Sequence, residues 1–183
     1  MMCTDPTLYS GAFMHKILIA TLAAGVMAAG VAQSATTTAS FQVTASVQAT
    51  CSASAATLAF GTYTPGGGAL TGNSNITVKC TKGTAFTVAL NAGSTTGDTF
   101  AQRLMANGAA TSTLQYNLYT TSALATVFGD GSAGTATLGG TGAGVTTANA
   151  VTVPVFGSLP DSAANQAALV GGYTDTIAVT VSY

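Results

Sequence analysis

The sequence predicts an all-β sandwich, and three observations support this fold class. Thr, Ser, Ala, Gly and Val dominate the chain, apolar residues recur at every second position in short runs, and Gly or Asn residues separate these runs. Alternation of this kind places apolar side chains on one face of an extended strand, whereas a helix repeats about every 3.6 residues. Several short strands divided by turn residues are typical of a sandwich.

Residues 1–34 are interpreted as an upstream extension followed by a secretory signal peptide. Met14–Lys16 provides a charged start, and an Ala-rich apolar run then continues to about Ala32. This run is shorter than the roughly 20 apolar residues that cross a bilayer. We therefore expect translation to begin at Met14, cleavage to fall between Ala32 and Ala35, and the mature protein to have no membrane span.

The next stretch, Thr38 to Thr50, shows the clearest alternation in the chain. Polar Ser, Gln and Thr residues separate five apolar or small ones: Ala39, Phe41, Val43, Ala45 and Val47. A strand of this kind needs a partner that covers its apolar face. It can pair with the sheet of its own domain, or it can add to the open edge of another subunit.

Two cysteines, Cys51 and Cys80, remain after the predicted cleavage, with 28 residues between them. In an exported chain such a pair predicts a disulfide, which would stabilise the fold by about 3 to 4 kcal/mol in the chain-entropy model. The alternative is a pair of buried thiols.

Further alternating runs predict the remaining elements of the domain. We expect strands near residues 58–65, 75–82, 86–90, 114–119, 151–155 and 173–183, a mobile glycine-rich loop at residues 129–144, and a short helical turn at residues 163–169. Pro154 would place its strand near an edge. The predicted core consists of Phe60, Tyr63, Phe86, Leu90, Leu104, Tyr116, Leu118, Phe128, Phe156 and the terminal valines.

The composition argues against an enzyme, a cofactor site and a nucleic-acid-binding protein. Three basic residues face four acidic ones after cleavage, so the chain has no basic surface for nucleic acid. The only histidine, His15, lies in the signal peptide, and glutamate is absent, which removes the commonest metal ligand and general base. Gly129–Gly134 fits the letters of a dinucleotide fingerprint, but the helix that should follow is missing.

Several motifs together resemble the spore coat protein U domain, which subunits of archaic chaperone–usher pili of the Csu type use. The motifs follow one another in the expected order over nearly the whole mature chain: Phe41 to Val47 leading to Cys51, Leu58 to Tyr63, Cys80, Arg103 to Met105, Leu114 to Tyr119, Phe128 to Gly131, and the closing Gly172 to Tyr183. The closing motif is the most specific of them.

This resemblance implies an incomplete immunoglobulin-like sandwich that lacks its last strand. A periplasmic chaperone would fill the gap first, and the N-terminal extension of the next subunit would replace it in a pilus assembled at an outer-membrane usher. Residues 35–48 would be the donor extension and residues 49–183 the pilin domain, most simply that of the major pilin. The closing strand would contact the chaperone through Ile177, Val179, Val181 and Tyr183.

The burial of Phe41, Val43 and Val47 would contribute about 5 to 9 kcal/mol, which is comparable with the net stability of a whole domain. Such a pilus would support adhesion and biofilm formation. Two other functions stay open at this point. The chain could be a tip adhesin, or it could be a secreted monomeric binding module that uses the loop at residues 129–144.

Overall fold

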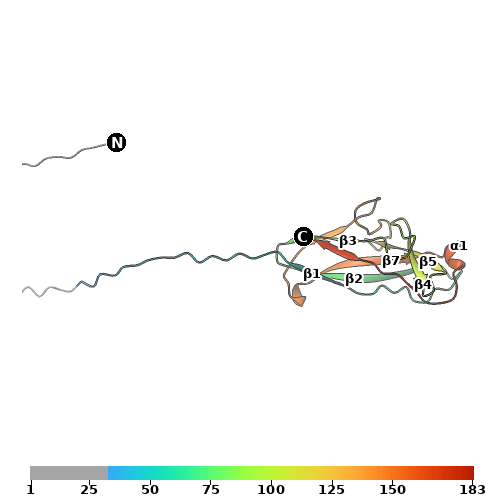
Figure 1. Ribbon diagram of the computed structural model, residues 1–183, viewed down its shortest axis with the longest axis horizontal. Helices are drawn as coiled ribbons and strands as arrows, with labels where there is room; N and C mark the ends of the chain where they lie inside the picture. Colours follow the sequence, from blue (N-terminus) through green and yellow to red (C-terminus); the bar gives the residue numbers. More distant parts are fainter. Residues whose placement is uncertain (1–32) are drawn as a thin grey trace, which may run out of the picture. The chain divides into compact units, whose positions relative to one another are not determined.

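The computed structural model describes residues 33–183, and β-strands form most of its regular structure (Figure 1). The strands are β1 (Cys51–Ala55), β2 (Leu70–Cys80), β3 (Ala85–Leu90), β4 (Arg103–Asn107), β5 (Thr113–Tyr119), β6 (Leu138–Thr141), β7 (Val151–Leu159), β8 (Tyr173–Thr174) and β9 (Val179–Ser182). A 3-10 turn, η1 (Thr147–Asn149), and one helical turn, α1 (Ala163–Gln166), complete the set. The predicted upstream extension and signal peptide, up to Ala32, lie outside the described residues.

The strands form two antiparallel sheets. The larger sheet has the order β1-β2-β7-β5-β4-β8, and the smaller has the order β6-β3-β9. The predicted all-β, immunoglobulin-like sandwich is therefore confirmed. Within the larger sheet, β7 pairs with β2 along nine residues but with β5 only at Phe156–Ser158, so Pro154 lies where β7 has a single partner. This is the edge-like setting that a proline needs.

The core lies between the sheets and follows from the alternation seen in the sequence. Buried and more exposed residues alternate along β2, β3 and β7, as expected for strands with one face toward the core. The buried apolar residues are Ile76, Val78, Cys80, Phe86, Val88, Leu90, Leu114, Tyr116, Leu118, Phe128, Val153, Val155 and Leu159.

Two residues expected in the core lie elsewhere, because neighbouring residues occupy the inward positions. Arg103 pairs across the strands with Tyr116 and is fully buried, so Leu104 points to the other face of β4. On β7, Val155, Gly157 and Leu159 are buried, and the intervening Phe156 is on the opposite face. Phe60 and Tyr63 are partly buried and pack against the core.

Three predicted elements differ from the structure. Residues 58–65 form no strand, because no other strand within the described part of the chain pairs with them. The expected closing strand at residues 173–183 is divided, since β8 pairs with β4 in the larger sheet while β9 pairs with β3 in the smaller one. The glycine-rich loop at residues 129–144 contains β6, which pairs with β3. The predicted helical turn is confirmed as α1.

The predicted disulfide is present between Cys51 and Cys80. These residues lie directly opposite each other in the register of β1 and β2, and their Cα atoms are 4.1 Å apart. The bond therefore fixes the first residue of β1 to the last residue of β2.

Residues 33–50, which precede β1, have no regular secondary structure, and their side chains are exposed. Within the described residues, 33–44 belong to a separate unit from Ala45–Tyr183. Phe41, Val43 and Val47 are 88%, 81% and 85% exposed, which is unusual for large apolar side chains. The apolar side chains of this predicted strand are thus uncovered.

Candidate functional site

An apolar groove of about 960 Å³ lies within the domain and is lined by residues of both sheets. Residues 55–63, which we name the first wall, border it on the side of β1, and residues 170–179, the second wall, border it on the side of β9. Its floor is formed by side chains that are at most 6% exposed: Ile76, Leu90, Leu114, Tyr116, Leu118, Val155 and Leu159. The groove thus gives access to the hydrophobic core itself.

The first wall has an unpaired backbone. Ala56 N donates to Asn75 O at 3.1 Å, and this is the last backbone contact that the wall makes with β2. Among the described residues, none forms a backbone hydrogen bond with residues 57–62. Free N–H and C=O groups in an extended segment are a template for the addition of another strand.

Side chains hold the first wall in place over a pair of glycines. Gly72 on β2 and Gly157 on β7 are cross-strand partners, and both lie under Leu58. A Cβ atom at Gly157 would lie 2.8 Å from Phe60 Cζ, so only glycine leaves room for this ring. Phe60 also packs edge-to-face on Tyr116, with ring centroids 6.0 Å apart.

Asp161 fixes the end of the first wall near α1. Its carboxylate accepts a hydrogen bond from the Tyr63 hydroxyl, and it also accepts bonds from Gly66 N at 3.1 Å and Gly68 N at 3.0 Å. The Tyr63 and Gly68 bonds hold the pKa of Asp161 below its ordinary value. Desolvation and the neighbouring carboxylate raise the pKa of Tyr63 to about 12.

The second wall crosses from one sheet to the other between β8 and β9. Its backbone is fixed at this crossing because Ala178 N donates to Asn91 Oδ1 at 2.9 Å and Asn91 N donates to Ala178 O at 3.1 Å. Asp175 anchors the start of the crossing. Its carboxylate accepts bonds from Tyr116 Oη at 2.6 Å, from Ser94 N and Oγ at 2.9 Å each, and from Thr176 N at 2.8 Å.

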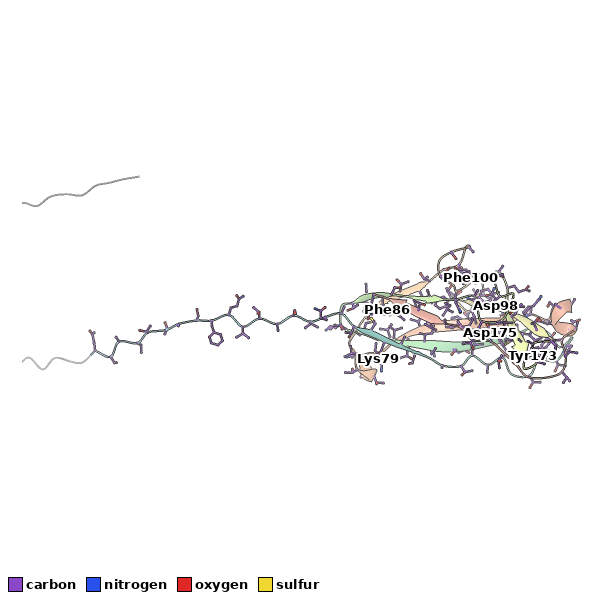
Figure 2. The ribbon with its side chains drawn as sticks, viewed as in Figure 1. Lys79, Phe86, Asp98, Phe100, Tyr173 and Asp175 are labelled. Carbon is purple, nitrogen blue, oxygen red and sulfur yellow. A yellow bond between two sulfur atoms is a disulfide. The ribbon has the colours of Figure 1, made fainter. Side chains whose placement is uncertain are left out.

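Asp175 and Asp98 lie in the same part of the domain, and their pKa values shift in opposite directions (Figure 2). Burial alone would raise the pKa of Asp175, but hydrogen bonds from Tyr116, Ser94 and Thr176 outweigh it and keep the pKa below its ordinary value. Burial raises the pKa of Asp98, and the nearby charge of Asp175 adds to this rise. Asp175 therefore ionises at a lower pH than Asp98.

A buried arginine braces the two sheets beside the groove floor. The Arg103 guanidinium donates to Asn117 Oδ1 at 2.6 Å in the larger sheet and to Asn91 O at 2.8 Å just beyond β3. It also donates to Phe128 O at 2.8 Å, while its Nε atom has no partner. Asn117 in turn donates to the carbonyl groups of Phe100 and Ala101. This network fixes β5, whose side chains form much of the floor.

The structure brings some of the predicted site residues together and leaves others apart. Cys51 and Cys80 are bonded, and Ile177 and Val179 line the groove. Val181 packs against the core on β9, and Tyr183 is 63% exposed. The predicted donor residues Ala39, Phe41, Val43, Ala45 and Val47 are all exposed.

Sequence reasoning missed the polar residues that hold the groove in shape. Arg103 and Asn165 are completely buried and Asn117 is 7% exposed. Asn165 Nδ2 donates to Gln115 O at 2.9 Å and to Pro160 O at 2.7 Å, which ties α1 to β5. The sequence contained a hint of these roles in two cases. Arg103 is one of only four basic residues, and Asn117 lies between the apolar residues Tyr116 and Leu118.

Within residues 33–183, no group of three or more His, Cys, Asp or Glu side chains is placed to hold a metal ion. No helix in that part of the chain has the length and apolar character needed to cross a membrane. The groove is the feature of the domain that calls for a functional explanation.

Comparisons with known proteins support the fold and identify the family. No curated protein matches this chain. A similar solved structure is the crystal structure of the CsuC–CsuE chaperone–tip adhesion subunit pre-assembly complex from archaic chaperone–usher Csu pili of Acinetobacter baumannii, with 20% identity and a TM-score of 0.52. The match covers 75% of this chain and 40% of that one, so it supports the fold alone.

The family model of the Spore Coat Protein U domain matches residues 37–180. This range includes the groove, both of its walls and most of the exposed extension. The chain therefore belongs to the Spore Coat Protein U domain family.

Proposed function

We propose that this protein is a structural subunit of a chaperone–usher surface pilus that polymerises by donor-strand exchange. One observation carries the proposal: the domain has an apolar groove beside an unpaired strand edge, and its N-terminal extension has an uncovered apolar face. Residues 35–48 of one copy would fill the groove of the next. Side chains at every second position would enter it: Ala39, Phe41, Val43, Ala45 and Val47.

The extension and the groove match in length and in chemistry. The donor stretch at residues 39–47 and the first wall at residues 55–63 each have nine residues, and nine residues of a strand extend about 30 Å. The unpaired backbone of the first wall can accept a strand, while the floor can accept its apolar side chains. The 5 to 9 kcal/mol that we expect from burial of the three large side chains would make each junction stable.

An unfilled groove exposes core side chains, so a partner is needed before assembly. We propose that a periplasmic chaperone covers the groove first, with contacts to Ile177, Val179, Val181 and Tyr183 at the end of the second wall and on β9. The similar solved structure is a complex of a chaperone with a pilus subunit, which supports this partner. Export would then lead through the periplasm and an outer-membrane usher to the cell surface, where the pilus supports adhesion and biofilm formation.

A place at the pilus tip is a second candidate, because the similar structure contains a tip adhesion subunit. Immunogold labelling of isolated fibres separates the two positions. Labels along the whole fibre would indicate a shaft subunit, and we expect this result. A single label at one end would indicate a tip subunit.

The introduction of a negative charge at either of two adjacent positions tests the proposed polymerisation. Phe41→Glu puts a carboxylate on the face that enters the groove, whereas Gln42→Glu puts the same charge on the opposite face. Because the burial of an unpaired charge costs several kcal/mol, we expect Phe41→Glu to lower fibre yield about a hundredfold in cells that also produce the chaperone and usher. Gln42→Glu should form fibres like the unchanged protein.

Both variants should still copurify with the chaperone, since the groove itself is unaltered. Electron microscopy and the quantity of polymer sheared from cells measure the result. Normal fibres from Phe41→Glu, or from a chain that lacks residues 35–47, would disprove donor-strand exchange by this segment.

A further inference from the structure

A methionine on β4 lines the groove. Met105 pairs across the strands with Leu114, which belongs to the groove floor, and it lies on the same face of β4 as the buried Arg103. Its side chain packs against the core but is only half-buried. A small solute that enters the open groove therefore meets the Met105 side chain.

Met105 also carries the only oxidisable sulfur of the predicted mature chain. The other four methionines and Cys3 precede the predicted cleavage site. Cys51 and Cys80 are already joined in a disulfide. A thioether that takes up one oxygen atom becomes a sulfoxide, which is polar and which reductases convert back. Oxidation of this chain would therefore act at a single position in the groove.

The strands that flank Met105 have no free hydroxyl to offer a sulfoxide. β4 lies between β5 and β8, and each of these strands carries a tyrosine that lines the groove. Tyr116 Oη on β5 donates to Asp175 at 2.6 Å, and Tyr173 Oη on β8 donates to Leu169 O at 2.6 Å. Water in the open groove would therefore be the hydrogen-bond donor to the sulfoxide oxygen.

We propose that Met105 is a reversible oxidation site, and that its oxidation stops an apolar segment from filling the groove. The inference rests on the proposed function for the identity of the occupant, whereas the oxidation itself needs only an open groove. An occupant that covered the sulfoxide would remove its water, and the burial of a polar group without a partner is costly. Conversely, a filled groove shields the thioether, so subunits with an occupant resist the oxidant.

The co-reactant is hydrogen peroxide or another donor of a single oxygen atom. A lone pair on the Met105 sulfur attacks one peroxide oxygen, the S–O bond forms as the O–O bond breaks, and water leaves. The sulfur loses two electrons, and the peroxide gains them. Thiol-dependent methionine sulfoxide reductases reverse the change.

The first experiment measures access to the sulfur. The host is the Phe41→Glu protein, because its groove is unaltered and we expect it to stay unassembled. Trypsin cleavage after Arg103 yields the peptide of residues 104–183, in which Met105 is the only methionine, so mass spectrometry assigns the added oxygen. We expect peroxide to oxidise Met105 in the folded protein. A synthetic peptide of residues 35–48, added at ten times its dissociation constant, should slow this oxidation about tenfold, because about a tenth of the grooves then stay open.

The second experiment measures what the sulfoxide does. We expect the fluorescently labelled peptide of residues 35–48 to bind the oxidised host about thirtyfold more weakly, which corresponds to about 2 kcal/mol, and reductase treatment to restore the affinity. Met105→Leu in the same host keeps the apolar volume and cannot be oxidised, so it should bind the peptide equally before and after peroxide. Guanidinium unfolding without the peptide should show that the oxidised host stays folded, since water reaches the sulfoxide in the open groove.

Oxygen uptake that occurs only in denaturant would overturn the inference, because Met105 would then be closed off in the folded domain. A sulfoxide that leaves the peptide affinity unchanged would also overturn it, as would an equal loss of affinity in peroxide-treated Met105→Leu. Unfolding of the host on oxidation would overturn it too, since the sulfur would then belong to the core. These results leave the proposed function intact, whereas a peptide that binds neither the unoxidised host nor Met105→Leu would disprove that function, and the inference with it.

Discussion

The two walls of the groove are held in different ways. The first wall, residues 55–63, has a free backbone at residues 57–62 and depends on a few side-chain contacts at Leu58, Phe60 and Tyr63. The second wall, residues 170–179, contains β8 and ends at the first residue of β9, both of which are paired, and Asp175 and Asn91 fix its crossing between them. Side-chain contacts therefore secure the first wall, whereas strand pairing and hydrogen bonds to the backbone secure the second.

This difference shows how a domain can keep a groove open before its occupant arrives. A strand edge is available to a partner only while its own backbone groups are unpaired, so the first wall must be positioned by other means. The backbone of the second wall can be hydrogen-bonded and still leave an edge for a partner. Its last residue begins β9, which pairs with β3 along one edge and, among the described strands, has no partner along the other. The first wall is thus expected to open locally at a lower free-energy cost than the second.

The largest effect is expected where the first wall rests on its glycine pair. Gly157→Val would bring a branched side chain against Phe60 and Leu58, which lie 2.8 to 3.0 Å from a Cβ atom at this position. Because overpacking costs about 1 to 3 kcal/mol, we expect a loss near 3 kcal/mol in the free energy of unfolding and a displaced first wall. Guanidinium unfolding of the chaperone-free protein measures the loss.

Gly108→Val is the matched control, since a Cβ atom there meets no neighbour within 4 Å and φ is not positive. It should change stability by less than about 0.5 kcal/mol. Equal stability losses in the two variants would show that the glycine pair does not position the first wall.

A smaller effect is expected from the second wall. Asp175→Asn keeps the shape of the side chain but removes the charge that accepts bonds from Tyr116, Ser94 and Thr176. Hydrogen bonds to a charged group contribute about 1.5 to 3 kcal/mol, and the half-buried setting of Asp175 reduces this through solvent screening. We therefore expect a loss of about 1 to 2 kcal/mol in the free energy of unfolding.

Asp130→Asn is the control for this change, because Asp130 is an exposed carboxylate that bonds only to Ser132 in its own loop. Its unfolding transition should coincide with that of the unchanged protein. If Asp175→Asn were equally silent, packing alone would be enough to hold the second wall.

The comparison of the walls also shows what the sequence could and could not predict. Alternation predicted β2, β3, β5 and β7, because an apolar period of two residues is a local property of a strand. It also predicted a strand at residues 58–65, where the apolar spacing is correct but no strand among residues 33–183 pairs with the segment. Pairing depends on the rest of the fold, so the period alone cannot separate a paired strand from a free edge.

Polar contacts across long sequence distances were beyond the same reasoning. Arg103 donates hydrogen bonds to Asn117, Asn91 and Phe128. Asp175 accepts hydrogen bonds from Tyr116 and from Ser94, and Ser94 precedes Asp175 by 81 residues. These contacts appear only when the sheets pack together. The disulfide was predictable because the predicted export signal, once removed, leaves two cysteines, which offer only one pairing. The donor residues Ala39, Phe41, Val43, Ala45 and Val47 and the domain boundaries at residues 35–48 and 49–183 remain predictions.

The smallest effect concerns pH at the end of the first wall. Since the pKa of Asp161 is lowered in the folded state, its contribution is complete above the ordinary value of 3.8 and is lost as the pH falls below it. The pKa of Tyr63 is raised from 10.0 to about 12, so its contribution is complete below pH 10.0 and is lost as the pH rises toward 12. Amide hydrogen exchange at Gly66 and Gly68, whose N–H groups bond to Asp161, reports both limits.

We expect the protection of these two amides, measured relative to the intrinsic exchange rate at each pH, to fall on both sides of this window, and Tyr63→Phe to remove the alkaline limit and weaken the acid one. The amide of Ala178 on the second wall is the internal control, because its acceptor, Asn91 Oδ1, does not titrate. Walls that are secured independently must lose amide protection independently. Equal loss of protection at Ala178, Gly66 and Gly68 at every pH would therefore show that the two walls open as one unit.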